Sequence, residues 1–582
     1  MTDLNRTELN EARFRQTGLG RIGLGQTWAR ARWAAGSSFR VFGLGLRRVL
    51  RMLTPFGRIR LTRFLFAPPD LRTTDPTVAA DIYAGQFVFA GRVVAAGGRS
   101  PFDVVAPTTS WAEALYGFGW LRHLQAANSS LARDNARTLI SDFSARIRRL
   151  PAVALQPHVI SRRLMALLAQ SPLVLDGASH EFYAQFLGLV RHEARLLRDA
   201  RHLSDDPTVR LVSAVALTTL GLCVEGAERL EKHFGRELSD QLEDQILADG
   251  GHISRNPRVL VDLMLDLLPV RSTYAARGLE APRGLVTAID RVVPHLKMLR
   301  HPDGSIALFN GMGASQVDAL ATIFASHDTG GRAATEAPYS GYHRLEAGGA
   351  ALIADTGPSP PFAVSADALA GCLSFEFSHQ RQRIFINCGV PRQSGPELPV
   401  ELRATAAHSA TTLSEVSSCQ FISRRGETRI LKGPRKVTAT RTVTPEGESI
   451  ALSHDGYVAR FGLTLQRSFL LHSDGLALSG VDSVAGAVSA LPEGGMRTTR
   501  FHLHPSMQAG RTAKGDVLLT PARGASWLFR CEGAHVSLED SVFFSGNEGA
   551  RRTSQIVLAT TSLAEAVSWQ LVRLAQDDVA PS

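Results

Sequence analysis

The chain has 582 residues, of which 44% are hydrophobic and 20% charged, so it is too long for one core and too apolar for general disorder. Its formal net charge of +10 lies in residues 1–63, where thirteen arginines stand against three acidic residues; the rest is neutral, which disfavours nucleic acid as the partner of the body. Five widely spaced cysteines without a C-x-x-C pair exclude a disulfide scaffold and a zinc-finger pattern.

Residues 1–67 are predicted to form a basic, Arg-rich N-terminal arm. Such an arm on a neutral body suggests an anionic surface partner, and the alternative is a poorly ordered, solubilising leader. Within it, residues 39–66 mix apolar side chains with regularly placed arginines, so an anionic membrane surface is one possible partner. The first twenty residues lack the apolar segment of a signal peptide, and no apolar run is long enough to span a membrane.

Residues 68–325 show apolar side chains at helical spacing and are predicted to form a helical domain. Plausible N-caps and prolines precede several of the predicted helices. The helices are expected near 76–91, 110–127, 129–149, 157–170, 175–202, 206–234, 238–248, 256–268, 283–300 and 314–325. Their lengths and short connections fit stacked helical hairpins, as in an incomplete (α/α) toroid, although periodicity also fits a superhelix.

Residues 326–340 are rich in Gly, Ala, Thr and Ser and are predicted to be an interdomain linker. From 341 to 582 the pattern changes to short runs of alternating polar and apolar residues bounded by Gly, Asp and Pro, which predicts an antiparallel β-sandwich. Strands are expected at 349–355, 383–387, 449–453, 466–471 and 517–520. The fold class is therefore multidomain α+β, with an N-terminal incomplete toroid followed by a C-terminal sandwich.

Several phrases, in the same order, resemble the heparinase II/III family of polysaccharide lyases. In the predicted sandwich they read A-G-C-L-S-F-E (370–376), R-I-F-I-N-C-G (383–389), R-A-T-A-A-H-S (403–409) and H-D-G-Y (454–457). In the helical half, residues 249–257 are similar to the family phrase D-G-G-H-x-x-R-x-P. The resemblance implies a toroid packed with a β-sandwich and β-elimination of an acidic, uronate-containing polysaccharide, with no organic cofactor.

The resemblance also implies roles for particular residues. His252, Arg255 and Asn256 would hold the uronate carboxylate, which acidifies the neighbouring C5 proton and stabilises the charge formed on its removal. His408 would be the base, and Tyr274 is the nearest candidate to protonate the leaving oxygen, although it does not sit on the family position. The structural alternative is that Asp249 and Asn256 cap a helix, His252 packs without a chemical role, and Tyr274 is an ordinary half-buried tyrosine.

Three positions depart from the family pattern. Leu369 or a neighbour stands where these lyases carry a histidine, Asn387 replaces an aspartate, and Leu465 occupies another histidine position. Only His408 of a three-ligand zinc set remains, so no metal site is predicted. These departures favour an alternative function, a non-catalytic glycan-binding or envelope-associated protein. A third possibility is an enzyme that acts on a different envelope glycan with a rearranged base. The resemblance predicts the cell envelope or periplasm, with the cytoplasm as the alternative because no signal peptide is visible.

Overall fold

The computed structural model describes residues 60–327, 333–391, 398–424, 426–486, 495–545, 549–563 and 565–575. Most of the predicted basic arm, including residues 39–59 of its apolar segment, and residues 328–332 of the predicted linker therefore lie outside the described residues. Within the described part of the chain, no helix has the length and apolar character needed to cross a membrane.

The chain divides into two compact units. The first contains residues 1–245, 266–286 and 361–365, and the second contains residues 246–265, 287–360 and 366–582. The helix α12 (Pro257–Ala276) contributes to both units, since its residues up to 265 belong to the second and the rest to the first. The predicted domain boundaries, at 67 and between 325 and 341, stay predictions of the sequence.

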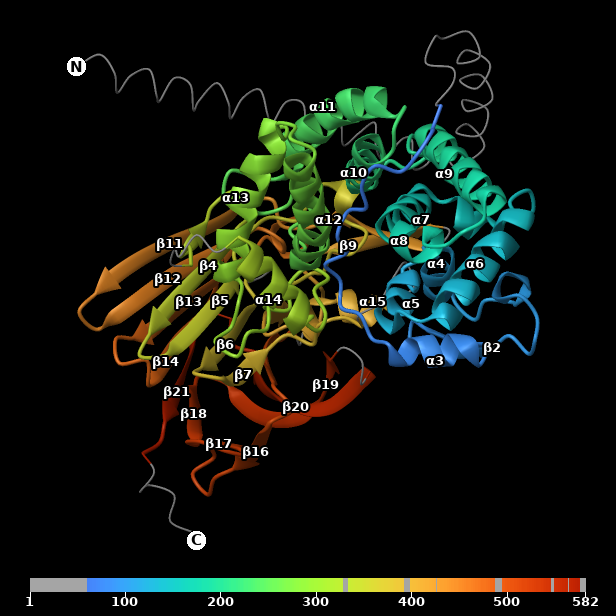
Figure 1. The fold of residues 1–582 in the computed structure, drawn as a ribbon. Helices are drawn as coiled ribbons and strands as arrows, with labels where there is room; N and C mark the ends of the chain where they lie inside the picture. Colours follow the sequence, from blue (N-terminus) through green and yellow to red (C-terminus); the bar gives the residue numbers. More distant parts are fainter. Residues whose placement is uncertain are drawn as a thin grey trace, which may run out of the picture. The chain divides into compact units, whose positions relative to one another are not determined.

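The first unit consists mainly of helices (Figure 1). Besides the second half of α12 they are α3 (Thr77–Tyr83), α4 (Thr109–Tyr116), α5 (Leu121–Ala127), α6 (Ser130–Ala145), α7 (Pro157–Ala169), α8 (Ser171–Leu175), α9 (His180–Ala200), α10 (Pro207–Cys223) and α11 (Glu228–Gln245). The N-termini of α4, α6, α9 and α10 are capped by side-chain oxygens of Thr108, Ser129, Ser179 and Asp206, as expected for these residue types.

Several predicted helices are wrong in extent. The segment predicted as one helix over 110–127 is α4 and α5, the break predicted between 234 and 238 is absent from α11, and α12 continues past 268 to Ala276. The segment predicted as one helix over 76–91 is α3 followed by a hairpin of β1 (Gln86–Phe89) and β2 (Arg92–Ala95). The segment predicted over 206–234 breaks at Gly226, which has a positive φ of 86°. A Cβ at this position would lie 1.9 Å from the carbonyl oxygen of Arg60, so only glycine fits.

The described end of the predicted arm packs on the first unit. The Leu65 N–H donates to the carbonyl of Cys223, and the Phe64 ring lies 5.5 Å from that of Phe186. The Thr62 hydroxyl donates to the Glu225 carboxylate at 2.8 Å. These contacts place residues 61–66 on the surface formed by α9 and the α10–α11 turn.

The second unit contains two large sheets in which every strand pair is antiparallel. One sheet has the order β11 (Val437–Thr444), β12 (Gly447–His454), β13 (Thr464–His472), β14 (Ala477–Ala485), β21 (Val567–Arg573), β18 (Trp527–Glu532), β17 (Val517–Pro521), β16 (Met507–Arg511). The other has the order β19 (His535–Ser545), β20 (Gly549–Thr560), β15 (Arg497–Leu503), β7 (Gln382–Ile386), β6 (Phe375–His379), β5 (Ala350–Asp355), β4 (Tyr342–Ala347), β3 (Glu336–Ala337), and β8 (Thr411–Leu413) also pairs with β15.

Smaller elements complete this unit. The strands β9 (Gln420–Arg424) and β10 (Glu427–Lys432) form a separate hairpin. The helices are the first half of α12, most of α13 (Arg283–Met298), α14 (Val317–Ser326), α15 (Val400–Arg403) and α16 (Val458–Phe461). The predicted strands at 349–355, 383–387, 449–453, 466–471 and 517–520 are confirmed as β5, β7, β12, β13 and β17.

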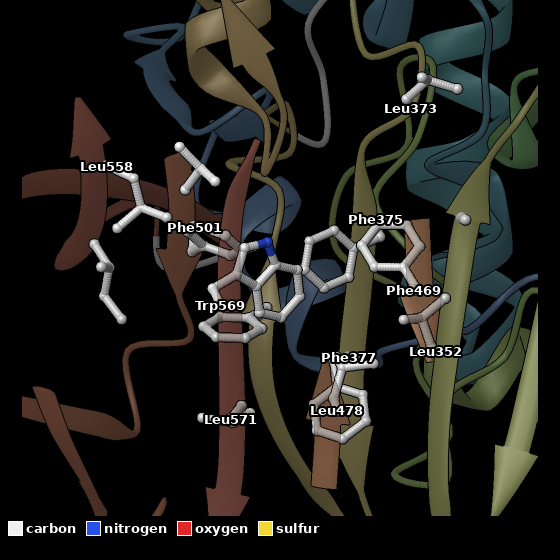
Figure 2. Packing of buried hydrophobic residues seen from close by; sticks show 14 of the residues in the cluster. Leu352, Leu373, Phe375, Phe377, Phe469, Leu478, Phe501, Leu558, Trp569 and Leu571 are labelled. Carbon is white, nitrogen blue, oxygen red and sulfur yellow. The ribbon is translucent and has the colours of Figure 1, made fainter. Parts of the chain in front are cut away.

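Aromatic side chains from both sheets form the core of the second unit (Figure 2). Phe375 on β6 lies 4.6 Å from Phe469 on β13, and Phe501 on β15 lies 4.8 Å from Trp569 on β21, measured between ring centroids. Each of these pairs joins one sheet to the other, which is the packing of a β-sandwich. Alternate residues of β13 are buried, in agreement with the period of two seen in the sequence.

Candidate functional site

The D-G-G-H-x-x-R-x-P phrase forms a tight turn before α12 in the second unit. Gly250 has a φ of 83°, and a Cβ there would lie 2.0 Å from the carbonyl oxygen of Arg291. Asp249 accepts hydrogen bonds from the N–H groups of Tyr339 and Ser340 at 2.8 and 2.7 Å. The phrase therefore holds the chain just before β4 through a partly buried carboxylate, rather than capping a helix with it.

His252 is buried within this turn. Its Nδ1 accepts a hydrogen bond from the Ser254 N–H at 3.1 Å and lies 2.8 Å from the Ser254 hydroxyl. Burial lowers the pKa of His252 to about 3, so the ring is neutral at physiological pH. A neutral ring does not supply the positive charge that neutralising a uronate carboxylate requires.

Arg255 is bound entirely by its own chain. Its Nε donates to the Ser340 carbonyl at 2.6 Å, and its terminal nitrogens donate to the Asp355 carboxylate and to the carbonyls of three further residues: Gly341, Gly357 and Pro358. These bonds use all five N–H donors of the guanidinium. Burial alone would lower the pKa of Arg255, but the Asp355 carboxylate outweighs it and the pKa is raised. The charged Arg255 side chain thus joins the turn before α12 to residues 340–341 and 355–358, and we call it a structural clamp.

Asn256 caps α12. Its side-chain oxygen accepts from the Arg258 N–H at 2.9 Å, and its amide nitrogen lies 3.5 Å from the Asp367 carboxylate. Pro257 follows as the first helical residue, the position that proline favours. The capping alternative drawn from the sequence describes this geometry. Beside it, a pocket of about 290 Å³ is lined by residues that include Arg258, Asp262 and Gln316.

Tyr274 lies on the part of α12 that belongs to the first unit. Its hydroxyl donates to the Glu231 carboxylate at 2.9 Å, and the side chain is fully buried. Burial and this hydrogen bond raise the pKa of Tyr274. The hydroxyl proton is therefore already held by an internal carboxylate.

His408 is buried in the second unit with its Nδ1 2.9 Å from the Ala404 carbonyl, which makes Nδ1 the protonated nitrogen. Burial lowers the pKa of His408, so the ring is neutral and its Nε2 carries a lone pair. That edge of the ring faces Gly371, where a Cβ would lie 3.2 Å from Nε2. His408 is therefore in the neutral state that its predicted role as a base needs.

The positions that depart from the family pattern have structural roles. Leu369 packs in a small apolar cluster with Val390 and Leu398. The Asn387 side-chain oxygen accepts from the Ser409 N–H at 2.9 Å, and its amide lies 3.4 Å from Glu376. Within the described residues, no group of three or more His, Cys, Asp or Glu side chains is arranged to hold a metal ion.

The charged centre of this region is a buried network that sequence reasoning missed. Glu376 accepts from Arg383 at 2.6 Å and from the Leu308 N–H, and lies 2.9 Å from His301 Nε2. Burial opposes the charge of Glu376, but Arg383 and these bonds lower its pKa to about 2. His301 begins the sequence H-P-D-G (301–304) and Glu376 ends the L-S-F-E phrase; the two residues are 75 positions apart, so no local pattern indicated the pair.

The five predicted site residues thus fall into three places. His252, Arg255 and Asn256 share one turn, and Asp355 connects this turn electrostatically with His408, whose pKa it influences. Tyr274 belongs to the other compact unit. The structure brings the turn residues together as a clamp and a helix cap.

Comparison with known proteins identifies the fold. Residues 329–570 match the family described as "Heparinase II/III-like, C-terminal". Among solved structures, heparinase III has a TM-score of 0.67 at 13% identity, covering 95% of this chain and 93% of its own. The heparan sulfate lyase HepC of Pedobacter heparinus has a TM-score of 0.56 at 15% identity, covering 88% and 86%. The predicted fold class of toroid plus sandwich is therefore confirmed.

A curated relative is more similar in sequence. FtsZ-localized protein C of Caulobacter vibrioides is 29% identical over 524 residues, which cover 87% of this chain and 89% of that protein. Residues 329–570 thus match the heparinase II/III-like C-terminal family, and the whole chain has the fold of heparinase III.

Proposed function

We propose that this protein is a non-catalytic member of the lyase fold that acts by binding, and that it does so where FtsZ is found. The sequence suggested this function as the alternative to a lyase: a non-catalytic binding protein built on the lyase fold. The finer alternative, β-elimination of an acidic polysaccharide, requires a free cation and a proton donor at the substrate.

The observation that carries the proposal is the state of Arg255. All of its N–H donors are bound within the second unit, and its charge is balanced by Asp355. Binding a sugar carboxylate would require breaking this buried pair, which costs about 3–5 kcal/mol when one partner is removed. Neutral His252 offers no replacement charge, and the Tyr274 proton is held by Glu231.

The place of action is proposed from the curated relative. Its printed name, FtsZ-localized protein C, describes localisation with FtsZ and no cleavage reaction. Its similarity extends over most of both chains, so the whole architecture is shared rather than one domain. We extend that localisation to this chain.

Two binding partners predicted from the sequence remain part of the proposal. An acidic polysaccharide is compatible with the lyase fold shared with heparinase III. An anionic membrane surface would be bound by the arginines of residues 1–67, most of which lie outside the described residues.

One observation favours the lyase as a second candidate. His408 is neutral, and no hydrogen bond to its Nε2 is formed within the described residues. A neutral imidazole with a lone pair is the state that a general base needs. In that case a group other than Arg255 would neutralise the uronate carboxylate of the substrate during elimination.

Imaging tests the proposal. The full-length protein, fused to a fluorescent protein, is expressed in its own host beside labelled FtsZ. We expect the two signals to coincide and the fusion to disperse when FtsZ is depleted. A fusion that lies evenly along the envelope, or keeps its position without FtsZ, would contradict the proposed place of action. The same images separate the predicted envelope and cytoplasmic locations.

A further inference from the structure

A second concave site lies in the second unit, at one end of both sheets. A pocket of about 480 Å³ is lined by residues of the β6–β7 turn, the β17–β18 turn and the end of β21. Three arginines line it, one from each of these segments: Arg381, Arg523 and Arg573. A volume of this size is typical of sites that hold a small ligand or a short part of a larger one.

The pocket carries unbalanced positive charge. No acidic residue lines it, and within the part of the chain that the structure describes no carboxylate lies within ion-pair distance of Arg381, Arg523 or Arg573. Arg381 and Arg523 are exposed residues of turns, and Arg573 on β21 is partly buried. Most other partly or fully buried arginines of the two sheets, such as Arg441 and Arg467, have carboxylate partners. Like charges gathered in a concave surface repel one another and focus a field that attracts anions.

The wall of the pocket is fixed by the core. The His379 ring lies 5.5 Å from the ring of buried Trp527, whose N–H donates to the Gln382 side-chain oxygen at 3.3 Å. The side-chain NH₂ group of Gln382 donates to the Arg523 carbonyl and so connects the start of β7 with the β17–β18 turn. A pocket wall fixed in this way loses little conformational entropy when a ligand binds.

This site is separate from the family phrases. Gln382 begins β7, whereas Asn387 follows its other end, and five residues of extended strand span about 16 Å. Ser409, which follows His408, donates its N–H to Asn387 at that other end, and Arg255 of the turn before α12 pairs with Asp355. The basic pocket has no counterpart among them.

We propose that this pocket binds an acidic peptide segment of a partner protein. Arginine forks bind carboxylates bidentately, and clusters of them are a recurring mode of recognising acidic peptides. The lining contains no Trp, Tyr or Phe side chain on which a sugar ring could stack, and its one aromatic ring, that of His379, packs on Trp527, which favours an acidic peptide over an acidic glycan. The inference stands apart from the proposed localisation with FtsZ.

The test is a titration of the full-length protein with a fluorescent oligoglutamate peptide that also carries a photo-crosslinking group. The variant Arg381→Ala/Arg523→Ala is compared with Arg530→Ala/Arg552→Ala, which removes two exposed arginines that pair with Asp516 and Asp540 outside the pocket. Both variants lose the same charge, so a difference between them reports the site. We expect roughly tenfold or greater weakening in the pocket variant alone, from lost charge-assisted hydrogen bonds.

Crosslinking separates the pocket from the basic arm. We expect crosslinks on residues 379–382 and 521–525, identified by mass spectrometry. Crosslinks confined to residues 1–63, or equal weakening by both double variants, would overturn the proposal. Stronger competition by an oligouronate than by an unlabelled peptide of equal charge would also overturn it, in favour of an acidic glycan.

Discussion

Arg255 illustrates how a residue type can suit two opposite roles. The family resemblance implied that Arg255 binds a carboxylate, and it does bind one, but that of Asp355 within the same unit. The sequence separation of one hundred residues hides this partner. Glu231, the hydrogen-bond partner of Tyr274, is also distant in the sequence, so local patterns do not reveal it. The capping role of Asn256 depends on neighbouring residues and could be predicted from the sequence.

Replacing Arg255 is expected to destabilise the protein strongly. Arg255→Ala leaves the Asp355 carboxylate buried without its cation, and we expect a loss of about 3–5 kcal/mol in the free energy of unfolding. Urea denaturation measures this loss. Arg258→Ala is the matched control, since its 3.5 Å contact with Asp367 is partly exposed and worth about 1 kcal/mol or less. A loss no larger than that of the control would mean that Arg255 is not a clamp.

Restoring the family aspartate at position 387 is expected to fail as a metal-site repair. In Asn387→Asp the new carboxylate would lie beside Glu376 in a buried site and would lose the amide donor, so like charges would repel. We expect a lower melting temperature with no recovery when zinc is added, with Asn387→Ser as the neutral control. Stabilisation by zinc would show that a metal site had been rebuilt.

At the scale of elements, local signals predicted most helices and the tested strands, and they failed where a distant contact decides the conformation. The break between α10 and α11 depends on Gly226, which lies against the backbone of Arg60. The helix predicted over 256–268 ends before Pro269, yet α12 continues through this proline to Ala276. Most of its side chains up to residue 270 are buried, so tertiary packing outweighs the low helix propensity of the proline.

The turn before α12 is expected to tolerate no side chain at its first glycine. Gly250→Ala would place a methyl group 2.0 Å from the Arg291 carbonyl at a positive φ, and we expect about 3 kcal/mol or more of destabilisation, measured by urea denaturation. Gly188→Ala, at an open, exposed site within α9, is the control and should stabilise by up to about 1 kcal/mol. Equal effects of the two variants would contradict the observed turn.

At the scale of the whole molecule, the short phrases that resemble the lyase family predicted the architecture. The prediction held although site residues differ, because a fold tolerates replacement of its catalytic residues. Heparinase III shares the fold at 13% identity. The strand order of the two sheets, in which β21 separates β14 from β18, could not be read from local periodicity. The basic pocket was missed for the same reason, since its three arginines are brought together only by that order.

Stability is expected to fall with mild acid. Burial lowers the pKa of several histidines from 6.5 to about 3 or about 4: His123, His252, His454, His502 and His504. The unfolded chain therefore binds protons below about pH 6.5 while the folded chain does not, so stability present above that pH is lost as the pH falls. Carboxyl groups with lowered pKa contribute only below about pH 4.5.

Urea denaturation between about pH 7 and about pH 5 measures this dependence. The midpoint should fall with pH, and the slope should be shallower in His252→Gln, which removes one of the titrating groups. A midpoint that stays constant over this range would contradict the neutral, buried state of these histidines.

The central claim, that the chain keeps the lyase fold without its reaction, is tested most directly by the ultraviolet absorbance of unsaturated uronate. The purified full-length protein is incubated with heparan sulfate, alginate, hyaluronan and an envelope extract of its host, with His408→Ala alongside. We predict no rise in absorbance from the folded protein on any of these polysaccharides. A rise that His408→Ala abolishes would contradict the claim and establish the chain as a lyase with His408 as its base.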